Sequence, residues 1–247
     1  MKWFCSLRSA FAFLTRLPVG PWRLQDDLHG IAMWLPVIGL VVGGLVGLAL
    51  WGLQQVFTPL ICAVLGCAVW VLITGGLHLD GVADCGDALP VEVSKERRLE
   101  IMKDSRLGTF GGIALFFNLV VKVAALASLL TFFADYFIVA CALAALLARV
   151  QIFLAMKFPS ARPGGMGAAF AEGTRPWHAI VAYVITLACC AYVGILGALA
   201  FLAASLFALV FLSYAKRRLG GVTGDVFGCL IELTENVVLL VFCFANV

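Results

Sequence analysis

Long apolar runs separated by short polar connections dominate the pattern of the chain. Runs of about 20 residues can cross the ~30 Å hydrocarbon core of a bilayer as helices. We find no internal repeat and no low-complexity linker, so residues 1–247 should form a single domain. Seven runs are long enough, and we predict spans at Ile31–Phe57, Leu60–Leu79, Phe110–Phe133, Tyr136–Met156, His178–Ile195, Leu196–Tyr214 and Val226–Phe244.

The residues before the first span have a different pattern. Arg8 and Arg16 interrupt the apolar stretch and Pro18 ends it, which argues against a signal peptide. Helical spacing instead separates an apolar face from a polar face, and we predict an amphipathic helix lying in the membrane interface. A short first span is the alternative. The apolar face would carry Trp3, Leu7, Phe11, Leu14 and Leu17.

The composition agrees with a membrane protein. The chain is 63% hydrophobic and 13% charged, with a mean hydropathy of +1.07, whereas soluble domains carry about 25% charged residues. The nine cysteines lie mostly within apolar runs and have no zinc-finger spacing, so we expect no disulfide framework. We therefore predict an all-α, polytopic membrane helix bundle with the lipid bilayer as its partner and no nucleic-acid partner.

The basic residues define an orientation. Short loops that carry Lys and Arg face the cytoplasm. Of the 17 Lys and Arg residues, 15 precede the first span or lie in every second connection, and the alternate connections have none. This predicts a cytoplasmic N-terminus and an external C-terminus. The cytoplasmic groups are Lys2, Arg8, Arg16 and Arg23; Lys95, Arg97, Arg98, Lys103 and Arg106; Lys157, Arg162 and Arg175; and Lys216, Arg217 and Arg218.

The two remaining cations, Lys122 and Arg149, lie inside predicted spans. An ion in this environment usually faces a partner or a wet cavity and is a functional candidate. For Arg149, near the cytoplasmic end of its span, we expect a functional role. For Lys122, a structural ion pair and a functional role remain equally open.

An acidic stripe follows the second span, in GLHLDGVADCGDAL. Asp80, Asp84 and Asp87 lie at i, i+4 and i+7, on one side of a helix. Adjacent carboxylates repel one another, and a hard divalent cation such as Mg²⁺, which prefers oxygen ligands, would relieve that repulsion. A solvated acidic helix end is the alternative interpretation.

A second acidic segment, GGVTGDVFGCLIELTE, opens the last span from the same side. Asp225 and Glu232 share a helix face, with Gly228 between them, where a glycine permits close approach of a helix or substrate. Glu232 and Glu235 lie in an otherwise apolar helix and are functional candidates. With the stripe, these acids suggest one metal–diphosphate site.

Basic residues between the acidic segments suit phosphate binding. Lys103 and Arg106 lie in ERRLEIMKDSRLGTFGG, and Arg162 lies in the glycine-rich ARPGGMGAAF. Arginine binds phosphate oxygens in bidentate fashion, and glycine-rich backbone amides can cradle phosphate. Positive-inside anchoring explains part of this pattern. The residues together predict a cytoplasmic site for phosphate or diphosphate chemistry, without naming the substrate.

At these segments the chain resembles the cobalamin synthase (adenosylcobinamide-GDP ribazoletransferase) family. The matching stretches are TRLPV, HLDGVADCGDAL, ERRLEIMKDSRLGTFGG, ARPGGMGAAF and GDVFGCLIELTE, in the family's order along the chain. The resemblance implies a Mg²⁺-dependent enzyme of the bacterial inner membrane, active on its cytoplasmic face. It would join adenosylcobinamide-GDP and α-ribazole, or α-ribazole 5′-phosphate, and give adenosylcobalamin, or its 5′-phosphate, and GMP.

We predict residue roles within that reaction. Arg106 and Arg149 would neutralise the leaving GMP, and Lys103 and Arg162 would bind substrate phosphate. One of Asp84, Asp225 and Glu232 would take the proton of the attacking 3′-hydroxyl. His78 is a further possible base, although it lies off the acidic stripe. The predicted Mg²⁺ ligands are Asp80, Asp84, Asp87 and Asp225.

Two other classes of protein compete with this interpretation. Membrane transferases of CDP-alcohol or isoprenoid type also pair aspartates with Mg²⁺, but the former have DxxDGxxAR, and no Arg follows Ala83 here. The isoprenoid motifs DDxxD and NDxxDxxxD are absent from the sequence. A transporter would usually show a repeat and helices broken at mid-membrane, and the acids here lie near one face.

Overall fold

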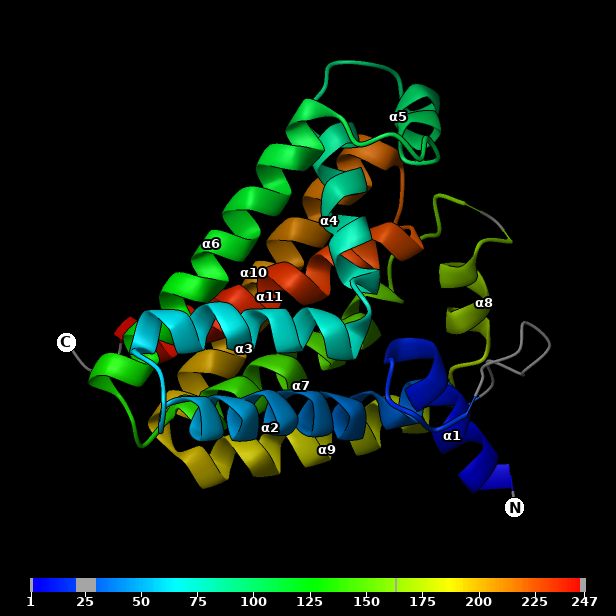
Figure 1. Cartoon of the computed structure of the whole chain (residues 1–247). Coiled ribbons are helices and arrows are strands. Elements are labelled where there is room, and N and C mark those ends of the chain that lie inside the picture. Colours follow the sequence, from blue (N-terminus) through cyan, green and yellow to red (C-terminus); the bar gives the residue numbers. More distant parts are fainter. Residues whose placement is uncertain (1, 21–29, 163, 245–247) are drawn as a thin grey trace.

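The computed structural model describes residues 2–20, 30–162 and 164–244. The basic-residue pattern included Arg23, which lies outside these residues. Within them the chain is helical, apart from one isolated backbone pairing of Ser160 with Val222 (Figure 1). The helices are α1 (Lys2–Leu14), η1 (Ile31–Trp34, a 3₁₀ turn), α2 (Leu35–Leu53), α3 (Pro59–Thr74), α4 (Leu77–Ala88), α5 (Lys95–Ile101), α6 (Thr109–Phe132), α7 (Phe137–Ala155), α8 (Met166–Glu172), α9 (Pro176–Val193), α10 (Ile195–Leu219) and α11 (Gly224–Phe244).

The predicted membrane bundle is confirmed. Six helical segments of the described chain are long and apolar enough to cross a bilayer, and α3 with α4 makes a seventh if the pair counts as one span. The amphipathic segment at the N-terminus forms α1, whose interfacial position stays a prediction. Gly194, with a φ of 81°, separates α9 from α10 at the predicted boundary of the fifth and sixth spans.

The second span differs from the continuous helix Leu60–Leu79 that hydropathy predicts. α3 ends at Thr74, and α4 leaves it at an angle of 96°. Gly75 and Gly76 join the two helices with φ values of 65° and 69°, in the left-handed region that glycine enters without steric cost. The bend turns the acidic helix α4 away from the direction of α3 (Figure 1).

Small residues allow the helices of the core to pack closely. α7 is the most buried of the spanning helices that the structure describes. A Cβ at Gly39 or Gly43 of α2 would come within 2.6 Å or 2.2 Å of the backbone of α7. This four-residue spacing of glycines brings two helix backbones into contact, as is common between membrane helices. α7 thus forms the centre of the bundle; α11 packs on it, and α4 packs on α11 and α6.

The connections rich in Lys and Arg meet at one end of the bundle. Arg218, at the end of α10, donates hydrogen bonds to the carbonyls of Leu89 and Val91 at 2.8 and 2.7 Å. Ala161 donates to the carbonyl of Val222 at 2.9 Å, which joins the α7–α8 connection to the start of α11. Helix α1 and the last turn of α11 lie at opposite sides of the bundle (Figure 1). This arrangement agrees with an odd number of spans.

A topology experiment tests the predicted orientation. A reporter fused after Val93 should be active on the cytoplasmic side, because the α4–α5 connection belongs to the basic end. A reporter fused after Val247 should be active outside. Paired alkaline phosphatase and fluorescent-protein fusions measure both positions, and equal orientation of the two would contradict the seven-span topology.

Candidate active site

Two glycines bring α4 and α11 into backbone contact. A Cβ at Gly81 would come within 2.4 Å of the carbonyl oxygen of Asp225, and a Cβ at Gly228 within 3.3 Å of His78. Residues with side chains would push the helices apart. The glycines therefore place the acidic stripe of α4 beside the first turn of α11.

Three carboxylates gather where these helices meet. Asp84 is half-buried, and its carboxylate is in electrostatic range of Asp225, Asp80 and Asp87, in that order of strength. Asp225 accepts hydrogen bonds from Arg162 at 3.2 Å and from Thr223 at 3.3 Å. Among the described residues, neither Asp80 nor Asp84 has an ion-pair partner. The predicted cluster thus contains Asp80, Asp84 and Asp225, with Arg162 at its edge.

Asp87 has a defined structural contact. Its carboxylate accepts hydrogen bonds from the backbone N–H groups of Gly108 at 2.7 Å and Gly111 at 2.8 Å. These groups begin α6, where a helix leaves N–H groups without internal partners and favours negative charge. A Cβ at either glycine would come within 2.4 Å of this carboxylate. Asp87 therefore fixes the start of α6 against α4, at the edge of the acidic cluster.

The two basic residues before α6 are exposed. Arg106 pairs with Asp104 at 2.5 Å, and hydrogen bonds from the Arg106 side chain and backbone hold the pKa of Asp104 at about 2. Lys103 lies in the same connection. The contacts of Asp87 with Gly108 and Gly111 keep this connection next to the acids. Both cations thus lie on an exposed connection beside the acids, and Arg106 is held there by its ion pair with Asp104.

Arg149 and Glu232 belong to a separate cluster inside the bundle. Lys122 lies 2.6 Å from both Glu232 and Glu235, and Arg149 pairs with Glu235. All four side chains are at most 3% exposed. Two cations and two anions balance, as burial in a membrane requires. Polar contacts come from Trp70 to Glu235 at 3.2 Å and from Asn118 to Glu232 at 3.1 Å.

The structure therefore divides the predicted site residues into two groups. Asp80, Asp84, Asp87, Asp225 and Arg162 lie together at the basic end, with Lys103 and Arg106 in the adjoining connection. Arg149 and Glu232 lie within the membrane-spanning core. His78 is also buried, and neither of its ring nitrogens has a hydrogen-bond partner among the described residues. The predicted site did not include Trp70 and Asn118, because a tryptophan or an asparagine within an apolar run does not indicate in the sequence that it binds a buried carboxylate.

The donor set of the acidic cluster suits Mg²⁺. The groups in electrostatic range of Asp84 are mainly the carboxylates of Asp225, Asp80 and Asp87, and carboxylate oxygens are ligands that Mg²⁺ prefers. No three His, Cys, Asp or Glu side chains of the described chain are already placed around one metal position. The carboxylates would have to move closer together around an ion. A bound cation would relieve the repulsion between them, which favours its binding.

A small cavity opens beside the acids. Its volume is about 170 Å³, and it lies among α1, α2, α4, α7, α8 and α11. Asp80 and Asp225 supply charge at its wall, whereas most of its remaining lining is apolar. A cavity with polar groups at one side and apolar walls elsewhere is typical of small-molecule sites.

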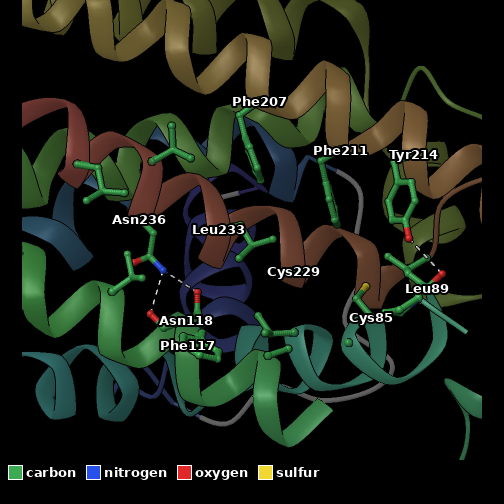
Figure 2. A pocket seen from close by; sticks show the side chains of 17 residues that line it. Cys85, Leu89, Phe117, Asn118, Phe207, Phe211, Tyr214, Cys229, Leu233 and Asn236 are labelled. Atoms are coloured by element: carbon green, nitrogen blue, oxygen red, sulfur yellow. Dashed lines mark hydrogen bonds between the residues drawn. The ribbon is translucent and has the colours of Figure 1, made fainter. Parts of the chain in front are cut away.

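A larger groove lies between α4, α6, α10 and α11 (Figure 2). Its volume is about 420 Å³, and no Asp, Glu, Lys, Arg or His lines it. Asn236 donates to Asn118 at 2.7 Å, and Tyr214 donates to the carbonyl of Leu89 at 3.2 Å. Phe207 and Phe211 of α10 point into it (Figure 2). With no acidic or basic side chain among the described residues of its lining, this groove offers no charged group for a metal–diphosphate.

Comparison with known proteins decides the family. Residues 6–243 match the family described as cobalamin-5-phosphate synthase. The chain belongs to the cobalamin-5-phosphate synthase family. A relative from Roseiflexus sp. (strain RS-1), named adenosylcobinamide-GDP ribazoletransferase, is 37% identical over 96% of this chain and 88% of its own length. One of the same name from Brevibacillus brevis (strain 47 / JCM 6285 / NBRC 100599) is 38% identical over 94% and 95%.

Likeness to this family spans all the helices that build the acidic site. A third relative with the same name, from Clostridium tetani (strain Massachusetts / E88), is 32% identical over 98% of this chain and 97% of its own length. No solved structure matches the chain. The arrangement of this cobalamin-5-phosphate synthase family member therefore rests on its own helices and contacts.

Proposed function

We propose that the protein joins adenosylcobinamide-GDP to α-ribazole, or to α-ribazole 5′-phosphate, and releases GMP. The observation that supports this most directly is the acidic cluster of Asp80, Asp84 and Asp225, held beside Arg162 at the basic end of a membrane bundle. The name that the relatives share, adenosylcobinamide-GDP ribazoletransferase, supports the choice of substrates. The products are adenosylcobalamin, or its 5′-phosphate, and GMP.

The reaction would exchange one phosphorus–oxygen bond for another. The ribose 3′-hydroxyl of the acceptor attacks the phosphorus that carries the cobinamide arm. A new oxygen–phosphorus bond forms, and the bond from that phosphorus to the bridging oxygen of GMP breaks. The hydroxyl proton passes to a carboxylate, and the electron pair leaves with GMP.

We assign the proton acceptor to the half-buried acids at the contact of α4 and α11. Asp84 is the first candidate, because Asp225 already accepts from Arg162 and Thr223. Glu232 was a third candidate, but Lys122 and Asn118 already bind it inside the bundle. A base must lie within hydrogen-bond reach of the proton that it removes, and the acids at the basic end are placed for a substrate from the cytosol.

The same residues would hold Mg²⁺ in the working enzyme. Asp80, Asp84 and Asp225 would bind it, with Asp87 close by at the start of α6. When bound, Mg²⁺ would neutralise charge on the diphosphate. Arg162 would bind phosphate oxygens from its position beside Asp225. Arg106 and Lys103 would approach from the exposed connection and neutralise the leaving GMP.

We propose the bacterial inner membrane as the location, with the acidic site facing the cytoplasm. The support is the one-sided distribution of Lys and Arg and the meeting of those connections at one end of the bundle. The diphosphate substrate would then enter from the cytosol, and the C-terminus would lie outside.

An assay with purified protein tests the proposed function. Protein in lipid nanodiscs should form adenosylcobalamin from adenosylcobinamide-GDP and α-ribazole in the presence of Mg²⁺. A chelator should stop the reaction, and added Mg²⁺ should restore it. Parallel assays with a CDP-alcohol and with an isoprenyl diphosphate should give no product. Turnover of either alternative, with none of the corrinoid, would overturn the proposal.

A further inference from the structure

The cavity beside the acids is small and mostly apolar. Its volume is about 170 Å³, and Phe170 of α8, Ile231 of α11 and Leu35 of α2 are among its lining residues. The ring of Phe170 stacks on that of Phe13 at a centroid distance of 6.5 Å. Asp80 and Asp225 reach the same cavity. It therefore joins an apolar chamber to the carboxylates of the candidate active site.

The proposed substrates offer four large groups that could enter it, and three of them do not fit: the corrin, the guanine and the adenine of the adenosyl group. A cavity of about 150 Å³ holds a benzene ring, so 170 Å³ is far too small for a corrin macrocycle. Guanine and adenine carry hydrogen-bonding groups around most of their edges, and the cavity offers partners only at His78, Asp80 and Asp225, so burying the remaining groups against apolar walls is costly. The dimethylbenzimidazole base of α-ribazole is flat and largely apolar, and its glycosylated ring leaves one nitrogen as a polar atom.

The position of the cavity also favours the nucleobase of the acceptor nucleoside as its occupant. The nucleobase and the attacking 3′-hydroxyl belong to one nucleoside, so the nucleobase must bind next to the carboxylates that receive the hydroxyl proton. The cavity has this position, because Asp80 and Asp225 line it and both are in electrostatic range of Asp84. The larger groove between α6 and α10 is also apolar, but none of the described residues that line it is Asp, Glu, Lys, Arg or His.

We propose that this cavity binds the aromatic base of the acceptor nucleoside, with its ribose at the edge formed by Asp80 and Asp225. This inference rests on the proposed function. It implies that the side chains of α1, α8 and α11 that line the cavity determine which nucleobase the enzyme accepts. Phe170 and Ile231 are two of the side chains that would set the size of the chamber. The donor, adenosylcobinamide-GDP, would lie outside the chamber, over the acids.

A truncation in the chamber wall tests this assignment. Phe170→Ala should raise the KM for α-ribazole by about tenfold, because loss of apolar contact in a pocket weakens binding by that order. The KM for adenosylcobinamide-GDP should not change. The matched control is Phe211→Ala, since Phe211 also stacks on a phenylalanine, Phe207, but lines the other groove. The control should keep both KM values.

A filling substitution gives the converse result and separates binding from folding damage. Ile231→Phe places a larger side chain in the wall and makes the chamber smaller. The variant should therefore discriminate against α-ribazole in favour of the riboside of unsubstituted benzimidazole. Phe170→Ala should shift preference toward a riboside with a larger, naphthalene-fused base. General damage to the fold would lower activity with every base alike, whereas opposite shifts in preference require the base to touch these walls.

Equilibrium binding of α-ribazole, measured without the donor, distinguishes failure of the chamber assignment from failure of the proposed function. Weaker binding in Phe170→Ala than in the wild-type protein supports the chamber even where turnover is low. If the wild-type protein turns over both substrates but neither variant alters base preference, the chamber assignment is wrong and the proposed function stands. If the wild-type protein neither binds α-ribazole nor forms product, both are wrong. A changed KM for the donor alone would place the donor in the chamber and overturn the inference.

Discussion

Asp84→Asn should lower turnover by at least about a thousandfold while the protein still inserts in the membrane. The change removes one negative charge and the basicity of a carboxylate in the centre of the acidic cluster, and general base catalysis alone supplies about 10²–10⁴-fold. Asp84 is in electrostatic range of Asp225 on α11 but forms no ion pair with the described residues, so we expect the fold to tolerate loss of its charge. Steady-state turnover in nanodiscs at saturating Mg²⁺ measures the effect.

The matched control for this variant is Asp135→Asn. Asp135 is an exposed carboxylate in the connection between α6 and α7, at the opposite end of the bundle. The substitution is chemically the same but lies away from the proposed site, so turnover should stay within twofold of wild type. Near-normal activity in Asp84→Asn would remove Asp84 from the site and leave Asp225 as the candidate base.

Glu235→Gln should lower the free energy of unfolding by about 3–5 kcal/mol, because removing one member of a buried ion cluster leaves an uncompensated charge. Glu235 is fully buried and pairs with both Lys122 and Arg149, so its loss leaves two cations facing Glu232 alone. Equilibrium unfolding in mixed micelles measures the change. The matched control is Glu100→Gln, which breaks the exposed pair with Arg97 and should cost less than about 1 kcal/mol.

A double variant identifies charge imbalance as the cause. Replacing both partners, as Arg149→Met with Glu235→Leu, leaves Lys122 and Glu232 balanced and should recover much of the lost stability. A Glu235→Gln protein as stable as wild type would contradict the ion cluster. That result would mean that Arg149 has another partner inside the membrane.

Arg149→Lys decides between the ion cluster and the predicted substrate contact. Lysine keeps the charge but cannot bind two oxygens in the planar geometry of a guanidinium. If Arg149 serves the cluster, stability should fall and both KM values should stay near wild type. If it grips the diphosphate, the KM for adenosylcobinamide-GDP should rise while that for α-ribazole stays unchanged.

Hydropathy predicts most of the fold, because crossing a bilayer requires long apolar helices whatever their neighbours are. It does not predict the bend at Gly75 and Gly76, since a glycine pair inside an apolar run is also compatible with a straight membrane helix. The acidic stripe on α4 was visible in the sequence because its i, i+4, i+7 spacing lies within one helix.

The partners of these residues were harder to predict. Periodicity places Arg149 and Glu235 on their own helices but does not say which helices are neighbours, so their pairing appears only in the folded chain. Asp87 was grouped with the metal ligands because of its spacing, whereas its contacts with Gly108 and Gly111 depend on how the following connection turns back. Sequence thus identified the charged residues better than it divided them between catalysis and structure.

Product analysis of a single reaction tests the central claim most directly. Protein in nanodiscs with Mg²⁺, adenosylcobinamide-GDP and α-ribazole should release one GMP for each adenosylcobalamin formed, as quantified together by chromatography and mass spectrometry. Asp84→Asn run in parallel should form neither product. Release of GDP in place of GMP, or GMP release without a joined corrinoid nucleotide, would contradict attack by the ribazole hydroxyl at the phosphorus that carries cobinamide.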